Sequence, residues 1–208
     1  LVFMDENGLL FGEEYTLVAC AEYVLQSEKG ALVSNLSSSR ALADLANDCG
    51  VDYHASAVGE VHVVAKMKEV NAVIGGEGNG GVILPALHYG RDALVGIALF
   101  LSHLAKEKIS VSALKARYAS YVMDKKKIEL SPSWDADALL AAVAKTFANE
   151  RVTTIDGVKI DFDDSWIHLR KSNTEPIIRL YGEAKTQEKM ADKINTIEAA
   201  IAAFVAST

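Results

Sequence analysis

Residues 72–83, AVIGGEGNGGVI, form a glycine-rich segment between two short apolar runs. Ala72 to Ile74 predicts a strand that leads into the glycines, because short runs rich in β-branched residues are typical of buried strands. Upstream, strand-like runs at residues 31–36 and 51–57 alternate with helical patterns. This alternation predicts an α/β domain with a mixed sheet and helices on both of its faces.

The helices of this domain are predicted from apolar spacing and from residues that start or stop a helix. Gly30 and Gly50 each end a helical pattern, and Asp92 and Ser110 can each cap one. Five helices are expected. The first covers residues 15–29, and the second starts after Ser37 to Ser39 and ends at Cys49. The others run from Gly59 through Val70, from Asp92 to Lys106, and from Ser110 to about Arg117.

A second domain is predicted after residue 117, where the pattern changes. A strand at 121–130 and a helix at 137–149 precede three strands in close succession and a final helix at 186–206. Strands joined by tight turns, such as Asp156-Gly157, indicate an antiparallel sheet with helices on one face. We therefore expect an α/β domain over residues 13–117 and a smaller α+β domain over residues 118–208.

The first twelve residues predict a hairpin. Asn7-Gly8 lies between the apolar runs Leu1 to Met4 and Leu9 to Phe11, and both turn positions can take the positive φ of a type I′ turn. The chain thus starts within a hairpin and without an initiator methionine. We expect residues 1–12 to be the tail of a preceding domain, in the C-terminal part of a larger protein.

The composition excludes several classes of partner. A formal charge of −7 without a block of basic residues argues against nucleic acid or an anionic membrane as the main partner. The longest strongly apolar run, Ala93 to Leu101, has about half the length needed to cross a bilayer. Cys20 and Cys49 each fall in an amphipathic helical pattern, which favours buried free thiols and a cytoplasmic protein.

The glycine-rich segment predicts a site for sugar hydroxyls. Gly76 to Gly81 matches G-x-G-x-x-G, but Val82-Ile83 and Pro85 follow it instead of a helix, which argues against a dinucleotide site. Glu77 can accept two hydrogen bonds from hydroxyls, and Asn79 can donate and accept at once. Gly78 and Gly80 would let the main chain come close to a ligand. The alternative is a simple turn between strands.

Residues 170–179, RKSNTEPIIR, predict a phosphate site. Ser172, Asn173 and Thr174 supply two hydroxyls and an amide, and Arg170 and Arg179 flank them. Short donors, backbone N–H groups in a concave turn and guanidinium forks are the groups that bind a phosphate dianion. The alternative is an ordinary polar hairpin loop.

Together, these two loops resemble those of the α-D-phosphohexomutase family, which includes phosphoglucomutase, phosphomannomutase and phosphoglucosamine mutase. Members carry a sugar loop of the type G-E-x-S/N-G-H/G in the third domain and a phosphate loop R-x-S-N/G-T-E-P in the fourth. Here Gly76 to Gly81 matches the first loop and Arg170 to Pro176 matches the second. Ser34 to Gly50 and Val58 to Met67 also resemble the third domain.

The resemblance implies an isomerase that interconverts hexose 1-phosphate and 6-phosphate through a phosphoserine enzyme and a bisphosphorylated sugar. It implies Mg²⁺ as cofactor, glucose or mannose bisphosphate as activator, and the missing N-terminal domains as partners. The sequence contains neither the T-A-S-H-N-P serine segment nor the D-x-D-x-D-R metal loop. We therefore expect this chain to recognise the hexose phosphate, to hold no catalytic or metal residue, and to be inactive alone.

One departure from the family concerns position 81, where many members have a histidine that assists proton transfer and this chain has Gly81. Candidates for the missing function are His62, Lys66, Lys68, His88 and Arg91. Ser37 to Ser39 are expected to cap a helix, because no base is implied beside them.

The alternatives are a non-catalytic module that binds sugar phosphates or nucleotides, an NAD-dependent enzyme, and phosphoglucosamine as the preferred substrate. The leading hypothesis requires the loops at residues 76–81 and 170–176 to face each other across one cleft.

Overall fold

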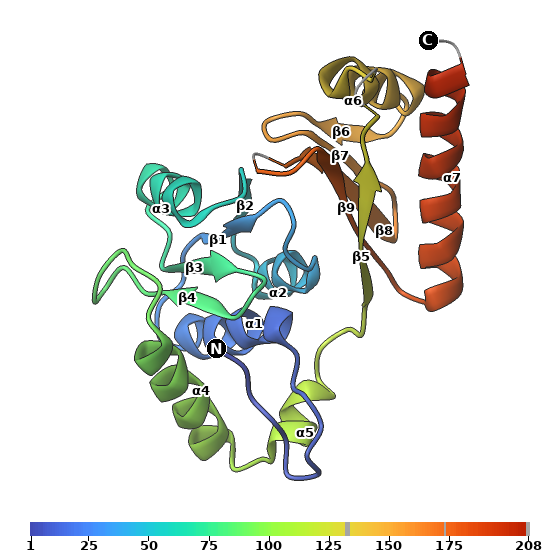
Figure 1. The fold of residues 1–208 in the computed structure, drawn as a ribbon. Helices are drawn as coiled ribbons and strands as arrows, with labels where there is room; N and C mark the ends of the chain where they lie inside the picture. Colours follow the sequence, from blue (N-terminus) through green and yellow to red (C-terminus); the bar gives the residue numbers. More distant parts are fainter. Residues whose placement is uncertain (132–133, 173, 207–208) are drawn as a thin grey trace. The chain divides into compact units, whose positions relative to one another are not determined.

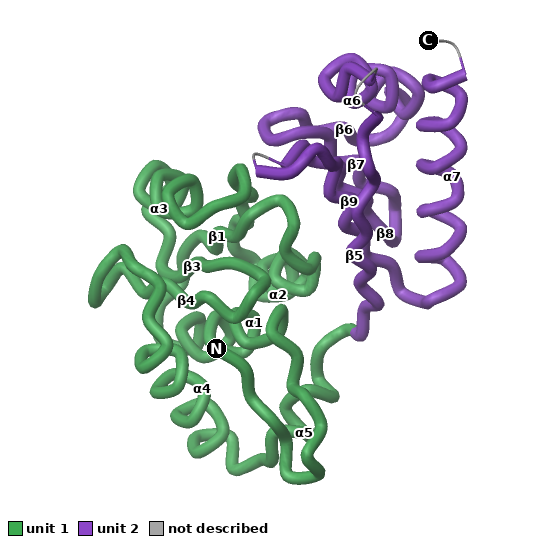
Figure 2. The backbone as a smooth tube through the Cα atoms, viewed as in Figure 1, with its two compact units in different colours: residues 1–119 green, residues 120–208 purple. Residues whose placement is uncertain are grey.

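The computed structural model describes residues 1–131, 134–172 and 174–206 (Figure 1). The chain divides into two compact units, Leu1–Ala119 and Ser120–Thr208 (Figure 2). Each unit has its own sheet. Among the described residues, no helix is both long and apolar enough to cross a membrane.

Unit 1 is built on a four-stranded mixed sheet with the order β2-β1-β3-β4. β1 (Leu32–Asn35) lies between β2 (Tyr53–Ser56) and β3 (Ile74–Glu77), and the three strands are parallel. β4 (Gly81–Ile83) runs antiparallel to β3. The mixed sheet of the α/β prediction is confirmed.

Helices cover both faces of this sheet, as predicted. Neighbouring residues of β3 show this, because successive side chains of a strand point to opposite faces. A Cβ built on Gly75 would lie 2.7 Å from Met67 Sδ of α3, and one on Gly76 would lie 3.3 Å from Leu17 Cδ1 of α1. The helices of unit 1 are α1 (Glu13–Leu25), α2 (Ala41–Cys49), α3 (Glu60–Glu69), α4 (Ala93–Glu107) and α5 (Val111–Lys115).

Two local predictions in unit 1 are wrong. The third strand starts at Ile74 rather than Ala72 and continues through Glu77, because pairing with both β1 and β4 holds the glycines in the sheet. The N-terminal turn is not of type I′: Gly8 has a φ of 79°, but Asn7 is not among the described residues with positive φ. Asp5 Oδ1 instead accepts the amides of Asn7 and Leu9, each at 2.8 Å.

Unit 2 is an antiparallel sheet with the order β5-β9-β8-β7-β6. Its helices α6 (Ala136–Thr146) and α7 (Gln187–Ala206) pack on one face, where Leu139 and Ile197 share a core with Ile167 and Leu180. The strands are β5 (Val122–Glu129), β6 (Arg151–Thr153), β7 (Val158–Asp161), β8 (Ser165–Lys171) and β9 (Ile177–Ala184).

The predicted α+β architecture is confirmed, but four strands follow α6, where three were predicted. The additional strand is β6, which has three residues at the sheet edge and is too short to give a periodic pattern. Gly157, with a φ of 68°, makes the tight turn between β6 and β7.

Both cysteines are free. Burial raises the pKa of the Cys20 thiol to about 12. Cys49 is only half-buried, which corrects the prediction of two buried thiols, because it is the last residue of α2 and its helical pattern ends at the surface.

Candidate functional site

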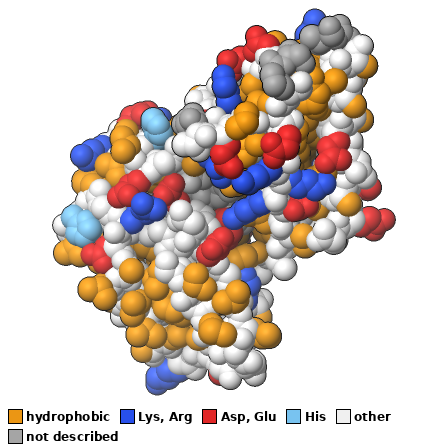
Figure 3. All heavy atoms as spheres, viewed as in Figure 1, with side chains coloured by type: hydrophobic (Ala, Val, Ile, Leu, Met, Phe, Trp, Pro, Cys, Tyr) orange, Lys and Arg blue, Asp and Glu red, His pale blue; other side chains and the backbone are white. Residues whose placement is uncertain are grey.

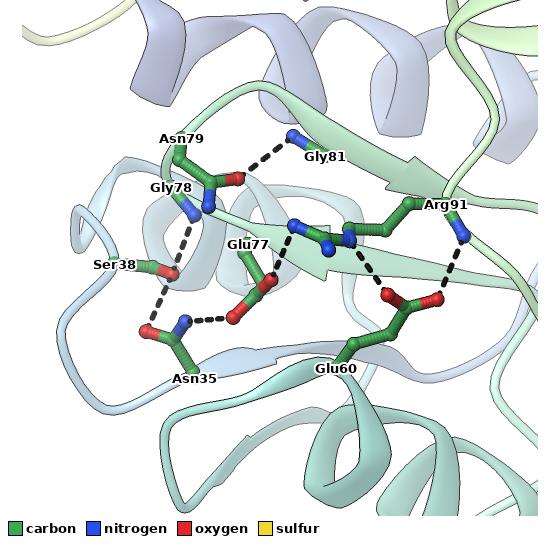
Figure 4. A network of polar contacts seen from close by, with 8 residues as sticks. All are labelled: Asn35, Ser38, Glu60, Glu77, Gly78, Asn79, Gly81 and Arg91. Atoms are coloured by element: carbon green, nitrogen blue, oxygen red, sulfur yellow. Dashed lines mark hydrogen bonds and ion pairs between the residues drawn. The ribbon is translucent and has the colours of Figure 1, made fainter. Parts of the chain in front are cut away.

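Glu77 is the last residue of β3, and its carboxylate is buried although it carries a charge. The residue is 6% exposed. Asn35 Nδ2 donates to Glu77 Oε1 at 3.1 Å, and Arg91 Nη1 lies 3.2 Å from Glu77 Oε2 (Figure 4). Asn35 is the last residue of the parallel neighbour β1. The ends of two parallel strands therefore bring both side chains to one edge of the sheet, where ligands of α/β proteins commonly bind.

The orientation of Asn35 is fixed by its other contacts. Its Oδ1 accepts the Ser37 amide at 2.9 Å and the Ser38 hydroxyl at 3.1 Å, which leaves its amide nitrogen to face Glu77. The Ser38 hydroxyl in turn accepts the Gly78 amide at 3.0 Å. A continuous set of hydrogen bonds thus holds the glycine-rich segment against the loop after β1 (Figure 4).

The capping prediction for the three serines is only partly right. Ser39 Oγ accepts the amide of Ala41, the first residue of α2, at 3.2 Å. Ser38 is directed to Gly78 instead, because the end of β3 lies beside the loop after β1. Sequence reasoning missed Asn35 and Ser38 as members of this site. The available signal was Asn35 inside an apolar strand run and the serines that follow this run.

The glycine-rich segment is a β-hairpin whose tip is formed by Gly78, Asn79 and Gly80. Gly80 has a φ of 82°, and a Cβ there would collide with the Leu1 carbonyl. A Cβ on Gly78 would collide with the Glu14 carboxylate. The atoms that come close to Gly78 and Gly80 in this structure therefore belong to Glu14 and Leu1 of the same chain. Asn79 is exposed, and its Oδ1 accepts the Gly81 amide at 3.2 Å.

Arg91 joins the hairpin to α3. Its Nε lies 2.7 Å from Glu60 Oε2, and its backbone amide donates to Glu60 Oε1 at 3.1 Å. These hydrogen bonds hold the pKa of the Glu60 carboxyl below its usual value. A hollow of about 460 Å³ opens beside Arg91, lined by Leu1, Glu60, Asn79, Gly80, Gly81, Val82, Arg91, Asp92 and Ala93. One guanidinium therefore bridges two carboxylates at the hollow.

The other four candidates for the role of a histidine at position 81 make no contact with the hairpin among the described contacts. His88 Nε2 lies 3.0 Å from Asp92 Oδ2, and Lys66 pairs with Glu69 at 2.7 Å. Lys68 Nζ lies above the Tyr89 ring, and His62 is exposed on α3. Among these five candidates and within the described contacts, Arg91 alone reaches the hairpin.

In unit 2, the predicted phosphate residues lie on the β8–β9 hairpin. Arg170 pairs in register with Arg179, and Arg179 pairs with Lys127 of β5. Residues directly opposite each other in a sheet share a face, so the three basic side chains form a row on the face opposite the helices. Sequence reasoning missed Lys127, although the run Lys125 to Lys127 in a predicted strand placed alternate lysines on one face.

Acidic side chains pair with this basic row. Glu175 lies 3.1 Å from both Lys127 Nζ and Arg179 Nη2. Asp156 Oδ2 lies 3.9 Å from Arg170 Nη1. Figure 3 shows Lys and Arg side chains gathered with Asp and Glu side chains over β5. A phosphate dianion would have to replace these carboxylates as the partner of the guanidinium groups.

The loop between the strands is closed by its own backbone. The Ser172 amide donates to the Ile177 carbonyl at 3.0 Å, and Ser172 Oγ accepts the Thr174 amide at 3.4 Å. Asn173, the central predicted donor, lies outside the described residues.

Beneath this loop, β8 carries buried polar groups. His168 is 1% exposed, and its Nε2–H donates to the Asp156 carbonyl at 2.6 Å. Burial holds the pKa of His168 below its ordinary value. The indole N–H of Trp166 donates to Glu183 at 3.0 Å. His168 thereby fixes the backbone of the turn that also carries the carboxylate partner of Arg170.

In the parts of the chain that the structure describes, no group of three or more His, Cys, Asp or Glu side chains could hold a metal ion.

Comparison with known families gives two matches along the chain. The model described as phosphoglucomutase/phosphomannomutase, alpha/beta/alpha domain III, matches residues 5–121. The model of the phosphoglucomutase/phosphomannomutase C-terminal domain matches residues 119–200.

Similar proteins are named phosphoglucomutase/phosphomannomutase or phosphoglucosamine mutase. A phosphoglucomutase/phosphomannomutase of Thermococcus kodakarensis is 37% identical over 90% of this chain and 41% of its own length. A probable phosphoglucosamine mutase of Methanopyrus kandleri is 30% identical over 91% of this chain and 42% of its own length. A crystal structure of a phosphoglucomutase/phosphomannomutase family protein from Burkholderia thailandensis superposes with a TM-score of 0.82 and 25% identity, over 97% of this chain and 44% of that chain. The present chain thus spans less than half the length of these relatives.

Proposed function

This chain belongs to the phosphoglucomutase/phosphomannomutase family, the α-D-phosphohexomutases, and we propose that it binds the sugar and phosphate groups of a hexose phosphate. The observation that carries the proposal is the buried Glu77 carboxylate, fixed by Asn35 and Arg91 at the end of β3. In the whole protein, the reaction would interconvert hexose 1-phosphate and 6-phosphate.

The sugar would bind at the glycine hairpin. Each Glu77 oxygen has one protein donor in the described contacts, and a carboxylate offers about four acceptor positions in all. Acceptor positions are therefore left for sugar hydroxyls, and Asn79 adds an exposed amide at the hairpin tip. Two carboxylates, Glu60 and Asp92, line the hollow together with one guanidinium, that of Arg91, so its charge favours neutral hydroxyls over a phosphate dianion.

The phosphate would bind at the β8–β9 hairpin. Arg170 and Arg179 supply guanidinium groups, and Ser172, Asn173 and Thr174 supply the short donors of the loop. The in-register row with Lys127 concentrates positive charge beside the loop. A phosphate held at one end of the substrate would position the other end for transfer.

Group transfer itself requires residues that this sequence does not contain. A phosphoserine would give its phosphoryl group to the free sugar hydroxyl, forming the bisphosphate, and would take back the other phosphate after the sugar turns over. A structure of Aspergillus fumigatus N-acetylphosphoglucosamine mutase, 14% identical with a TM-score of 0.65, is described as a complex with GlcNAc-6P and magnesium. For this family member we propose Mg²⁺ and a glucose or mannose bisphosphate activator in the whole enzyme, acting in the cytoplasm, with metal ligands that this sequence does not contain.

Arg170→Ala tests the phosphate site. We expect it to weaken binding of glucose 6-phosphate to this chain by about 1.5–3 kcal/mol, because a charged hydrogen-bond donor is lost. Isothermal titration calorimetry measures the change. Lys171→Ala is the matched control, since Lys171 is the next residue of β8, points to the other face and pairs with Asp137. Equal affinity of wild type and Arg170→Ala would remove Arg170 from the site.

Glu77→Gln tests the sugar site. We expect a larger loss of affinity for glucose 6-phosphate than for inorganic phosphate, because the carboxylate would bind only hydroxyls. Equal losses for both ligands would mean that the hairpin has a purely structural role.

A further inference from the structure

The side chain of Arg91 passes directly over Gly81. A Cβ built on Gly81 would lie 2.8 Å from Arg91 Cδ and 3.4 Å from Arg91 Cγ. Gly81 is not among the described glycines with positive φ, so its backbone would accept other residues. A larger residue at this position would have to displace the Arg91 side chain, and its Cβ would also lie 3.1 Å from Asn79 Oδ1.

The guanidinium of Arg91 is only partly used by the protein. It has five N–H donors, of which Nε faces Glu60 and Nη1 faces Glu77. Within the described contacts Nη2 has no partner, and the Arg91 side chain is 45% exposed. Because Arg91 also lines the hollow of about 460 Å³, donors remain available to a molecule bound there.

We propose that Arg91 is a sugar-binding residue, whose aliphatic stem fills the place that a larger side chain at position 81 would take and whose guanidinium faces the hollow. It donates its remaining N–H groups to a hydroxyl oxygen of the sugar that Glu77 and Asn79 hold. Glu60 is a positioning residue, since it holds both the Nε and the backbone amide of Arg91. This inference rests on the proposed function.

The chemistry of the guanidinium limits its role. A guanidinium has donors in a fixed planar fork and no acceptor, so Arg91 can act toward the sugar only as a hydrogen-bond donor. Its position between two carboxylates compensates its charge, which suits a neutral hydroxyl better than a second phosphate. A lysine could not bridge Glu60 and Glu77 in this way, because its ammonium is a single point charge on a flexible stem.

A double-mutant cycle tests the inference. Arg91→Ala, Gly81→Ala and the double variant are compared by calorimetry with glucose 6-phosphate, and inorganic phosphate is the second probe. We expect each single change to weaken glucose 6-phosphate binding by about tenfold, since each removes or displaces a charged donor. The double variant should bind no more weakly than Arg91→Ala, because Gly81→Ala acts through Arg91. Inorganic phosphate affinity should not change.

Arg117→Ala is the matched control, since Arg117 is similarly exposed and pairs with Glu107 away from the hollow. Unchanged or tighter binding by Arg91→Ala would overturn the inference, while losses in Glu77→Gln and Arg170→Ala would leave the proposed function standing. Additive losses in the double variant would overturn the assignment of Gly81. If the unaltered chain binds no hexose phosphate, the proposed function fails and the inference fails with it.

For Glu60, the conservative variant Glu60→Gln should weaken glucose 6-phosphate binding less than Arg91→Ala does, and should leave inorganic phosphate binding unchanged. Equal losses for both probes would overturn its role as a positioning residue, because a general loss of structure would affect both ligands.

Discussion

The two hairpins that carry the candidate residues differ in how far their charged side chains are buried. At the β3–β4 hairpin, the Glu77 side chain is 7% exposed and is held by Asn35 and Arg91. At the β8–β9 hairpin, the Glu175 side chain is 42% exposed and pairs with Lys127 and Arg179 at the surface. The first arrangement is organised before a ligand arrives, whereas the second must exchange its partners when a phosphate binds.

This difference predicts different mutational behaviour. Removing one partner of a buried charge leaves that charge poorly compensated and is strongly destabilising. An exposed ion pair is screened by water and contributes about 0–1 kcal/mol. Substitutions at the β3–β4 hairpin should therefore change both stability and binding, and substitutions at the β8–β9 hairpin should change mainly binding.

The largest expected effect on stability is that of Asn35→Ala. It removes a donor to the buried Glu77 and the acceptor of the Ser37 amide and the Ser38 hydroxyl. We expect the free energy of unfolding to fall by about 2–3 kcal/mol, as is usual when a buried charged group loses a hydrogen bond. Urea denaturation measures the change.

The control is Asn79→Ala, at the exposed tip of the same hairpin. This change should alter the free energy of unfolding by less than about 0.5 kcal/mol while it weakens glucose 6-phosphate binding. Equal stability losses at Asn35 and Asn79 would contradict the contrast between the two hairpins.

An intermediate effect is expected from His168, which is buried in β8 two residues before Arg170. Its pKa in the folded state is lowered by burial from the ordinary value of 6.5. Below that ordinary value, the unfolded chain takes up a proton that the folded chain does not bind. The contribution of neutral His168 is therefore complete above about pH 6.5 and is lost as the pH falls further, through the lowered folded-state value.

Thermal unfolding of wild type and His168→Gln, followed from about pH 7.5 to about pH 5.5, measures this contribution. Wild type should lose more stability than the variant over this range. Parallel curves of stability against pH for the two proteins would contradict a pH-dependent contribution of His168 to stability.

The smallest effect on stability is expected from Glu175→Gln. It should change the free energy of unfolding by less than about 1 kcal/mol, because both of its ion pairs are exposed. Affinity for inorganic phosphate should rise, since Lys127 and Arg179 lose a competing carboxylate. Calorimetry with phosphate measures this gain.

Glu198→Gln is the control for Glu175, because Glu198 makes a comparably exposed pair with Lys126 of the same strand β5. It should leave phosphate affinity unchanged. A loss of phosphate affinity in Glu175→Gln would show instead that Glu175 orders the loop.

Much of the fold was predictable from the sequence, because its signals are local. Asp92 and Ser110 cap α4 and α5 with their side chains as predicted. The α/β unit with its mixed sheet and the antiparallel unit follow from the spacing of strands, helices and turns. Failures occurred where local signals are weak: in the three-residue β6, in the glycines that belong to β3, and in the turn at Asn7-Gly8.

The sequence by itself determined the two unit architectures and the two chemical motifs, since each is a run of neighbouring residues with a recognisable pattern. Tertiary structure alone decided that Asn35 and Arg91 hold Glu77, that Arg91 fills the space over Gly81, and that Lys127 lies in line with Arg179 and Arg170. These partners are far apart in the chain. Their meeting depends on strand order and register, which are set by the packing of whole elements and not by the periodicity of any single segment.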